Sequence, residues 1–152
     1  MIEGCHEKEI SVQLDFIFSA SMAFVLAGWA ALAIAPVNRS YCLAFARGVA
    51  LVLALTYVWQ ISFNTVSVPG GDFMSLGGIT ALFSAPANVM LGWTHYLAFD
   101  LFIGSWELED SARLGIPHWL LIPCLALTLV VGPIGLLVYY IVREIWKRAK
   151  AA

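Results

Sequence analysis

The sequence predicts an all-α integral membrane protein, a bundle of four transmembrane helices with a short interfacial or re-entrant helix between the second and the third. Hydrophobic residues make up 61% of the 152 residues and charged residues only 12%, whereas soluble domains contain about 25% charged residues. Several uncharged runs approach the length of about 20 residues that a helix needs to cross a bilayer. We expect a single domain over residues 1–152, and a net charge of −2 argues against a nucleic-acid partner.

The first two spans are predicted over residues 16–35 and 40–63. Residues 16–35 carry no charge and repeat a small side chain at every fourth position, which lets another helix approach closely. In residues 40–63, Thr56, Gln60 and Asn64 share one helix face because they are four residues apart. That face should point away from lipid, and it is either a set of interhelical hydrogen bonds or the polar wall of a substrate pocket.

The connection to the third span begins with a turn signal, Pro-Gly-Gly-Asp, at residues 69–72. The apolar segment 73–85 that follows is too short to cross a bilayer. We expect it to be either a lid over one mouth of the bundle or a plain interfacial helix.

The third span, predicted over residues 86–106, contains two ionisable side chains, His95 and Asp100. A rise of about 1.5 Å per residue places both within the hydrocarbon depth. A charge at that depth is costly, so intramembrane ionisable residues indicate function by default. We expect both side chains to be sequestered from lipid at the centre of the bundle.

The next stretch, residues 107–117, contains Glu107, Glu109 and Asp110 and ends in Gly-x-Pro. Carboxylates suit a hard divalent cation, but an ordinary solvated loop is the preferred interpretation. The three cysteines form no Cys-x-x-Cys pair. We therefore expect no disulfide, no metal site and no cofactor.

The fourth span is predicted over residues 118–142, with two internal prolines that invite kinks. Thr128 falls on a face of small and polar side chains that suits contact with the third span. The basic tail after residue 142 predicts an anchor for anionic lipid on the cytoplasmic side. Lys8 and the four basic residues of the tail outnumber the three on the opposite side, which favours both termini in the cytoplasm.

Several motifs occur in the order found in one known family. The stretch that begins at Trp93 reads W-x-H-x-L-A-x-D-L-F, and a later one runs from Pro123-Cys124 to G-P-x-G-L at residues 132–136. The glycine-rich segment G-G-x-x-x-x-L-G at residues 70–77 and A-L-F-S at residues 81–84 precede both. Over roughly residues 40–140 the chain resembles the neoxanthin-synthase-like membrane proteins, which are named for an abscisic-acid-deficient plant mutant.

The resemblance implies a role in carotenoid metabolism, as plant members are needed to convert the epoxide violaxanthin into allenic neoxanthin. Such an isomerisation needs an acid and a base, for which Asp100 and His95 are the candidates, with Glu107 in reserve. Plant members carry a plastid leader, whereas residues 1–10 resemble no targeting signal; we therefore expect a bacterial inner-membrane protein. The candidate substrate-binding residues are Thr56, Gln60, Asn64, Trp93, Tyr96, Phe99, Phe102 and Thr128.

The partners expected are membrane lipids, a carotenoid or other isoprenoid substrate, and either a membrane protein partner or a second copy of the chain. A non-catalytic subunit that binds pigment or lipid, or scaffolds an enzyme, is the main alternative, with His95 and Asp100 as internal hydrogen-bonding groups. A transporter is disfavoured because the two helical hairpins show no internal repeat. A haem protein is disfavoured because His95 and His118 lie at different depths.

Overall fold

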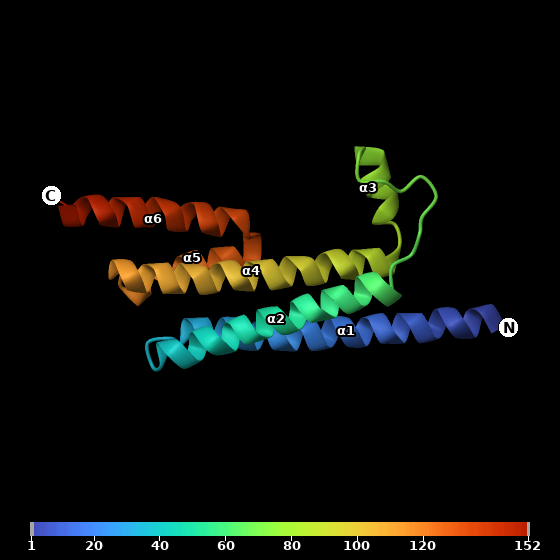
Figure 1. The fold of residues 1–152 in the computed structure, drawn as a ribbon, viewed down its shortest axis with the longest axis horizontal. Coiled ribbons are helices and arrows are strands. Elements are labelled where there is room, and N and C mark those ends of the chain that lie inside the picture. The colour runs from blue at the N-terminus through green and yellow to red at the C-terminus, as the bar shows by residue number, and fades with distance from the viewer. Residues whose placement is uncertain (1, 152) are drawn as a thin grey trace. The chain divides into compact units, whose positions relative to one another are not determined.

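The computed structural model describes residues 2–151, with side chains described from residue 11. The regular secondary structure of this part of the chain consists of helices joined by loops (Figure 1). The six helices are α1 (Ile2–Ala33), α2 (Arg39–Phe63), α3 (Leu76–Leu82), α4 (Pro86–Leu114), α5 (His118–Val131) and α6 (Pro133–Ala151).

Two helical segments in the described residues are long and apolar enough to cross a membrane, Ser11–Ala33 in α1 and Arg39–Phe63 in α2. Their large apolar side chains are mostly exposed: Phe16 is 74% exposed and Leu55 is 70% exposed. The core helices of a soluble protein would bury such side chains. These surfaces therefore suit contact with lipid.

The predicted boundaries agree best with the structure where charges or turn residues bracket an apolar run. Helix α2 matches the span expected over residues 40–63, and α1 begins earlier than residue 16. Helix α3 occupies part of the segment 73–85. Its first turn is capped by Ser75, whose hydroxyl accepts a hydrogen bond from the backbone N–H of Gly78 at 2.9 Å.

The prediction of a solvated loop over residues 107–117 is wrong. Helix α4 continues through most of this stretch to Leu114 and ends at Gly115, whose φ of +69° favours glycine. Glu107 is completely buried and Asp110 is 5% exposed. Two of the three acids expected in a surface loop are thus buried side chains of a helix, whereas Glu109 is 42% exposed.

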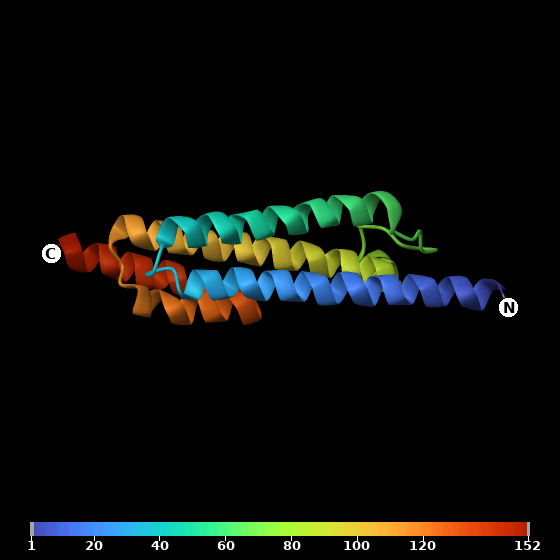
Figure 2. The same ribbon diagram turned by 90° about the horizontal axis from the view of Figure 1, so that it is seen from below.

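The single helix expected over residues 118–142 is interrupted. Gly132 adopts a φ of +50°, and Pro133 starts α6, which runs back beside α5 (Figure 2). A Cβ at Gly135 would overlap the backbone nitrogen of Thr128, so the close approach of the two helices requires glycine there. With 14 residues, α5 is about 21 Å long, which is shorter than the roughly 30 Å of hydrocarbon.

The chain divides into two compact units. The first comprises Met1–Phe24 and Val52–Leu97, and the second comprises Val25–Leu51 and Ala98–Ala152. Helices α1, α2 and α4 each contribute to both units, whereas α3 belongs to the first and α5 and α6 belong to the second. The four-span bundle and the single domain remain predictions, and each unit is described separately below.

Candidate functional site

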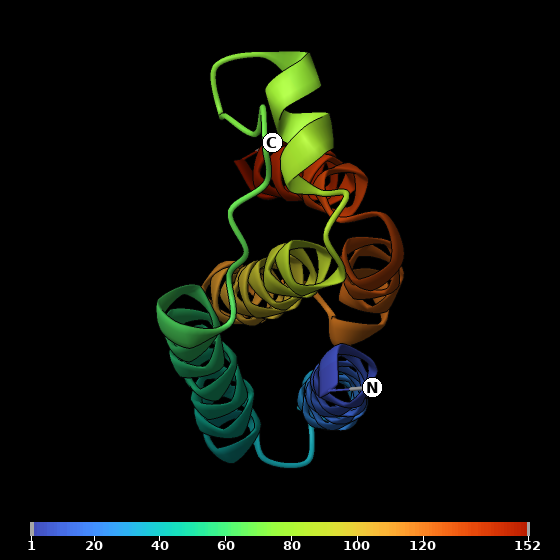
Figure 3. The ribbon, with the colours of Figure 1, turned by 90° about the vertical axis from the view of Figure 1, so that its right-hand side faces the viewer.

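The first unit contains a mainly apolar pocket of about 420 Å³. The loop after α2 leads to the short α3, which precedes α4 (Figure 3). The residues that line the pocket come from these segments and from the end of α2. A pocket of this size is in the usual range for small-molecule sites, about 300–1,000 Å³. Its lining side chains are aliphatic and aromatic with a few polar groups: Tyr57, Ile61, Thr65, Val66, Phe73, Leu82, Phe83, Asn88, Leu91 and His95, together with Gly92.

His95 lies at the wall of this pocket and is exposed, so the expectation that its side chain is sequestered is wrong. Its imidazole ring lies against the ring of Tyr57 on α2, with the centroids 5.6 Å apart and the planes tilted by 60°. One turn earlier on α4, a Cβ at Gly92 would lie 2.6 Å from the ring of Phe83. Glycine at that position therefore lets the aromatic end of the α3 segment approach the helix that carries His95.

Asn88 holds the pocket together and was not singled out from the sequence. Its side chain is 8% exposed, and its Oδ1 accepts a hydrogen bond from the backbone N–H of Val66 at 3.1 Å. Its Nδ2 donates to the carbonyls of Val66 and Leu82, both at 2.9 Å. One amide thus fixes the loop after α2 and the end of α3 to the first turn of α4.

The polar face predicted on α2 has mixed roles. Gln60 is 1% exposed, and its Nε2 donates to the hydroxyl of Thr94 on α4 at 2.9 Å. The hydroxyl of Thr56 instead donates to the carbonyl of Val52 in its own helix. Asn64 closes the C-terminal turn of α2 through its backbone N–H. Gln60 therefore takes the interhelical hydrogen-bonding role, and none of the three lines the His95 pocket.

The aromatic residues expected to bind substrate lie elsewhere on α4. The ring centroid of Trp93 lies 5.4 Å from that of Tyr96 and 6.2 Å from that of Phe18 on α1. Trp93 also lines a separate open groove of about 590 Å³ in the first unit. Phe99 and Phe102, which belong to the second unit, are 59% and 53% exposed.

In the second unit, α4 presents acids to the α5–α6 hairpin. Glu107 is completely buried, and its Oε1 accepts a hydrogen bond from the hydroxyl of Thr128 on α5 at 3.0 Å. Its Oε2 is buried and has no hydrogen-bond partner. Asp100 lies at the turn between α5 and α6, where a Cβ on Gly132 would be 3.3 Å from the carboxylate.

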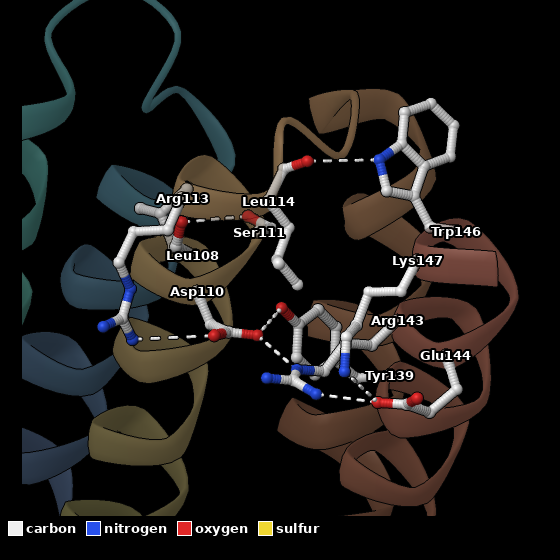
Figure 4. A network of polar contacts seen from close by, with 10 residues as sticks. All are labelled: Leu108, Asp110, Ser111, Arg113, Leu114, Tyr139, Arg143, Glu144, Trp146 and Lys147. Atoms are coloured by element: carbon white, nitrogen blue, oxygen red, sulfur yellow. Dashed lines mark hydrogen bonds and ion pairs between the residues drawn. The ribbon is translucent and has the colours of Figure 1, made fainter. Parts of the chain in front are cut away.

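Asp110, one turn beyond Glu107 and outside the predicted span 86–106, anchors α6 to α4 (Figure 4). Its Oδ2 accepts hydrogen bonds from the hydroxyl of Tyr139 at 2.8 Å and from Nε of Arg143 at 2.7 Å. Burial alone would raise the pKa of Asp110, but the hydrogen bonds from Arg143 and Tyr139 and the charges of Arg143 and Arg113 lower it below its usual value.

The last turn of α4 is also capped by α6. The indole N–H of Trp146 donates to the carbonyl of Leu114 at 3.3 Å, and Nζ of Lys150 donates to the same oxygen at 2.9 Å. Carbonyls at the end of a helix have no partner within that helix. The aromatic and basic residues of the tail therefore complete the end of α4.

The sequence-predicted catalytic residues thus fall into two groups. His95 belongs to the first unit, whereas Asp100 and Glu107 belong to the second, where both lie against the turn and the last residues of α5. Sequence reasoning missed Tyr57 and Asn88. A signal was available for Tyr57, since Tyr57 and Ile61 form an i, i+4 pair on α2.

Comparison with known proteins gives one match. A family model described as ABA DEFICIENT 4-like matches residues 16–139, which is most of the chain and includes His95, Asp100 and Glu107. No curated protein and no solved structure matched the chain.

Proposed function

We propose that this chain, which belongs to the ABA DEFICIENT 4-like family, binds the ring end of a carotenoid or related isoprenoid lipid in the His95 pocket and isomerises it. The family and the two apolar helices make it a neoxanthin-synthase-like membrane protein. The observation that carries the proposal is the pocket itself: about 420 Å³, walled by aromatic and aliphatic side chains, with an imidazole at its edge.

The reaction proposed is the opening of an epoxide without net oxidation or reduction. A base removes a proton from the polyene carbon beside the ring, and that C–H electron pair becomes a new carbon–carbon double bond. The C–O bond of the epoxide breaks, its electron pair stays on oxygen, and an acid protonates that oxygen. One proton leaves the substrate and one enters it, so the product is an isomer.

His95 is the base in this proposal, because a neutral imidazole accepts a proton near neutral pH. Its position against Tyr57 limits the motion of the ring. We assign the acid to Asp100, with Glu107 in reserve. Both are carboxyl groups of α4 that do not line the His95 pocket, and the variants below test each of them separately.

The test is turnover by the full chain, purified and placed in lipid nanodiscs with an epoxy-carotenoid, with products separated by chromatography and identified by absorption. We expect His95→Ala to lower kcat by about 10²–10⁴-fold, the usual contribution of a general base. Asp100→Asn should do the same if Asp100 is the acid, and Glu107→Gln should do so if Glu107 is.

Thr65→Ala is the matched control, because Thr65 also lines the pocket while its hydroxyl donates to the carbonyl of Ile61 in the preceding turn. Thr65→Ala should retain turnover. Full activity of folded His95→Ala would refute the assignment of the base.

The second candidate function is a non-catalytic subunit that holds a pigment or lipid for a partner enzyme. The hydrogen bonds of Asn88 and of the Gln60–Thr94 pair favour it, since these polar groups serve to hold helices and loop together. In that case the purified chain would bind the carotenoid and return it unchanged. Turnover would then require a copurified protein, and His95→Ala would weaken binding alone.

A further inference from the structure

We infer that the second unit contains a buried monovalent-cation site at Glu107, distinct from the proposed His95 pocket, in which a proton or Na⁺ neutralises the acids that α4 presents to α5. Glu107 is completely enclosed by the unit. One of its oxygens accepts the hydroxyl of Thr128, and the other, Oε2, is buried without a hydrogen-bond partner. Burying an ionised carboxylate with one oxygen that accepts no hydrogen bond costs free energy, unless a positive charge lies beside it.

No basic side chain of the described residues supplies that charge. Arg143 and Arg113 pair with Asp110, Arg47 pairs with Glu109 at the surface, and the remaining ion pairs join Glu144 to Arg143 and Lys147. None of these ion pairs includes Glu107. We therefore infer that the neutralising charge comes from outside the described side chains, as a bound cation.

The surroundings of Glu107 add to its negative potential. Asp100, two turns earlier on α4, repels Glu107 electrostatically. Cys124 on α5 and Tyr139 on α6 are the other titratable groups near Glu107, and they add no charge while they are protonated. Asp100 lies at Gly132, immediately after α5 ends. The carbonyl end of a helix is partially negative, and interrupted helices of this kind hold Na⁺ or a proton in membrane transporters.

The ligand set favours a monovalent cation over a divalent one. Ca²⁺ and Mg²⁺ need about six oxygen ligands, whereas no group of three or more His, Cys, Asp or Glu side chains in the described part of the chain could hold a metal ion. A proton needs a single oxygen, which Oε2 of Glu107 supplies, whereas Na⁺ would need further oxygen ligands beyond the carboxyl of Glu107 and the hydroxyl of Thr128.

The experiment uses the full chain in nanodiscs, with ¹³C-labelled and unlabelled glutamate, and two readouts that do not depend on isomerase activity. Infrared spectroscopy at neutral pH detects a protonated carboxyl through its C=O stretch. Thermal unfolding in sodium chloride, compared with choline chloride of the same concentration, detects Na⁺.

A carboxyl band that shifts with the glutamate label, disappears in Glu107→Gln and persists in Glu109→Gln identifies a proton. A Tm that rises with Na⁺ in the wild type and in Glu109→Gln but not in Glu107→Gln identifies Na⁺. Glu109→Gln is the matched control because Glu109 is half-exposed and pairs with Arg47. A wild type with neither a glutamate-dependent band nor a response to Na⁺ would overturn the proposal, whether or not the variants fold.

Discussion

Replacing Asp110 with Asn should weaken the contact between the tail helix α6 and α4, because one carboxylate oxygen of Asp110 accepts hydrogen bonds from both Tyr139 and Arg143. Hydrogen bonds to charged groups contribute about 1.5–3 kcal/mol each. The Tyr139 side chain is fully buried, so its hydrogen bond should contribute the whole of that free energy, about 1.5–3 kcal/mol. The Arg143 side chain is 23% exposed, and solvent reduces the contribution of its hydrogen bond to about 1 kcal/mol. The amide of Asn keeps one acceptor, so we expect a loss of about 2–4 kcal/mol.

The assay is reversible unfolding of the full chain in detergent, followed by tryptophan fluorescence. Trp106 reports directly, since its ring lies 5.5 Å from the ring of Tyr139. Asp110→Asn, Tyr139→Phe and the double variant form a mutant cycle, for which neighbours in one network give coupling energies of about 0.5–3 kcal/mol. Glu144→Gln is the control, because Glu144 pairs with Arg143 and Lys147 at the surface and should have little effect.

The same variant should have a defined pH dependence. A folded-state pKa below the unfolded value means that the Asp110 carboxylate stabilises the fold above about pH 4, and this stabilisation is lost as the pH falls through the lowered pKa. The difference between wild type and Asp110→Asn should therefore shrink below about pH 4. A difference that stays constant down to pH 3, or an Asp110→Asn variant as stable as Glu144→Gln, would refute the reasoning.

Three further predictions follow from the contacts described. Gly135→Ala should cost about 1–3 kcal/mol or more in an unfolding titration, because its Cβ would overlap Thr128, whereas Gly48→Ala meets nothing within 4 Å and should be neutral or stabilising. Arg47→Ala should cost less than about 1 kcal/mol in the same assay, since both partners of its ion pair are about 40% exposed. If α1, α2 and α4 cross the bilayer and the α5–α6 hairpin returns without crossing, reporter fusions should place the two termini on opposite faces; reporters on one face would support the four-span bundle.

Much of the helical content could be predicted from the sequence because lipid imposes simple rules. An uncharged run of about 20 residues can satisfy its backbone in hydrocarbon as a helix, and the span expected over residues 40–63 therefore matches α2. The same reasoning placed His95 on a helix, which is α4 in the structure. It could not locate the pocket, because the pocket depends on how Asn88 fixes a loop whose path the sequence does not determine.

The interruption of the helix predicted over residues 118–142 shows that the positions of prolines alone do not predict where a helix ends. Pro123 lies inside α5 and is accommodated there, so a proline in an apolar run does not by itself end a helix. The chain reverses at Gly132, where a φ of +50° is combined with a following proline. The reversal is stabilised only because Gly135 then fits against Thr128, a contact between residues that a straight helix would separate by about two turns.

The spacing of the residues around Glu107 was consistent with its burial, but the many charged residues in this stretch favoured the prediction of a loop. Five of the eight residues in the stretch Glu-Leu-Glu-Asp-Ser-Ala-Arg-Leu are polar or charged, and such a composition predicts a solvated loop. Glu107 and Asp110 are nevertheless spaced i, i+3, and Tyr139 and Arg143 are spaced i, i+4, so each pair shares a helix face. An acid pair on one helix face matched to a hydroxyl and a guanidinium on another is typical of two helices in contact. Both acids are buried because Asp110 accepts hydrogen bonds from Tyr139 and Arg143 of α6 and Glu107 accepts one from Thr128 of α5.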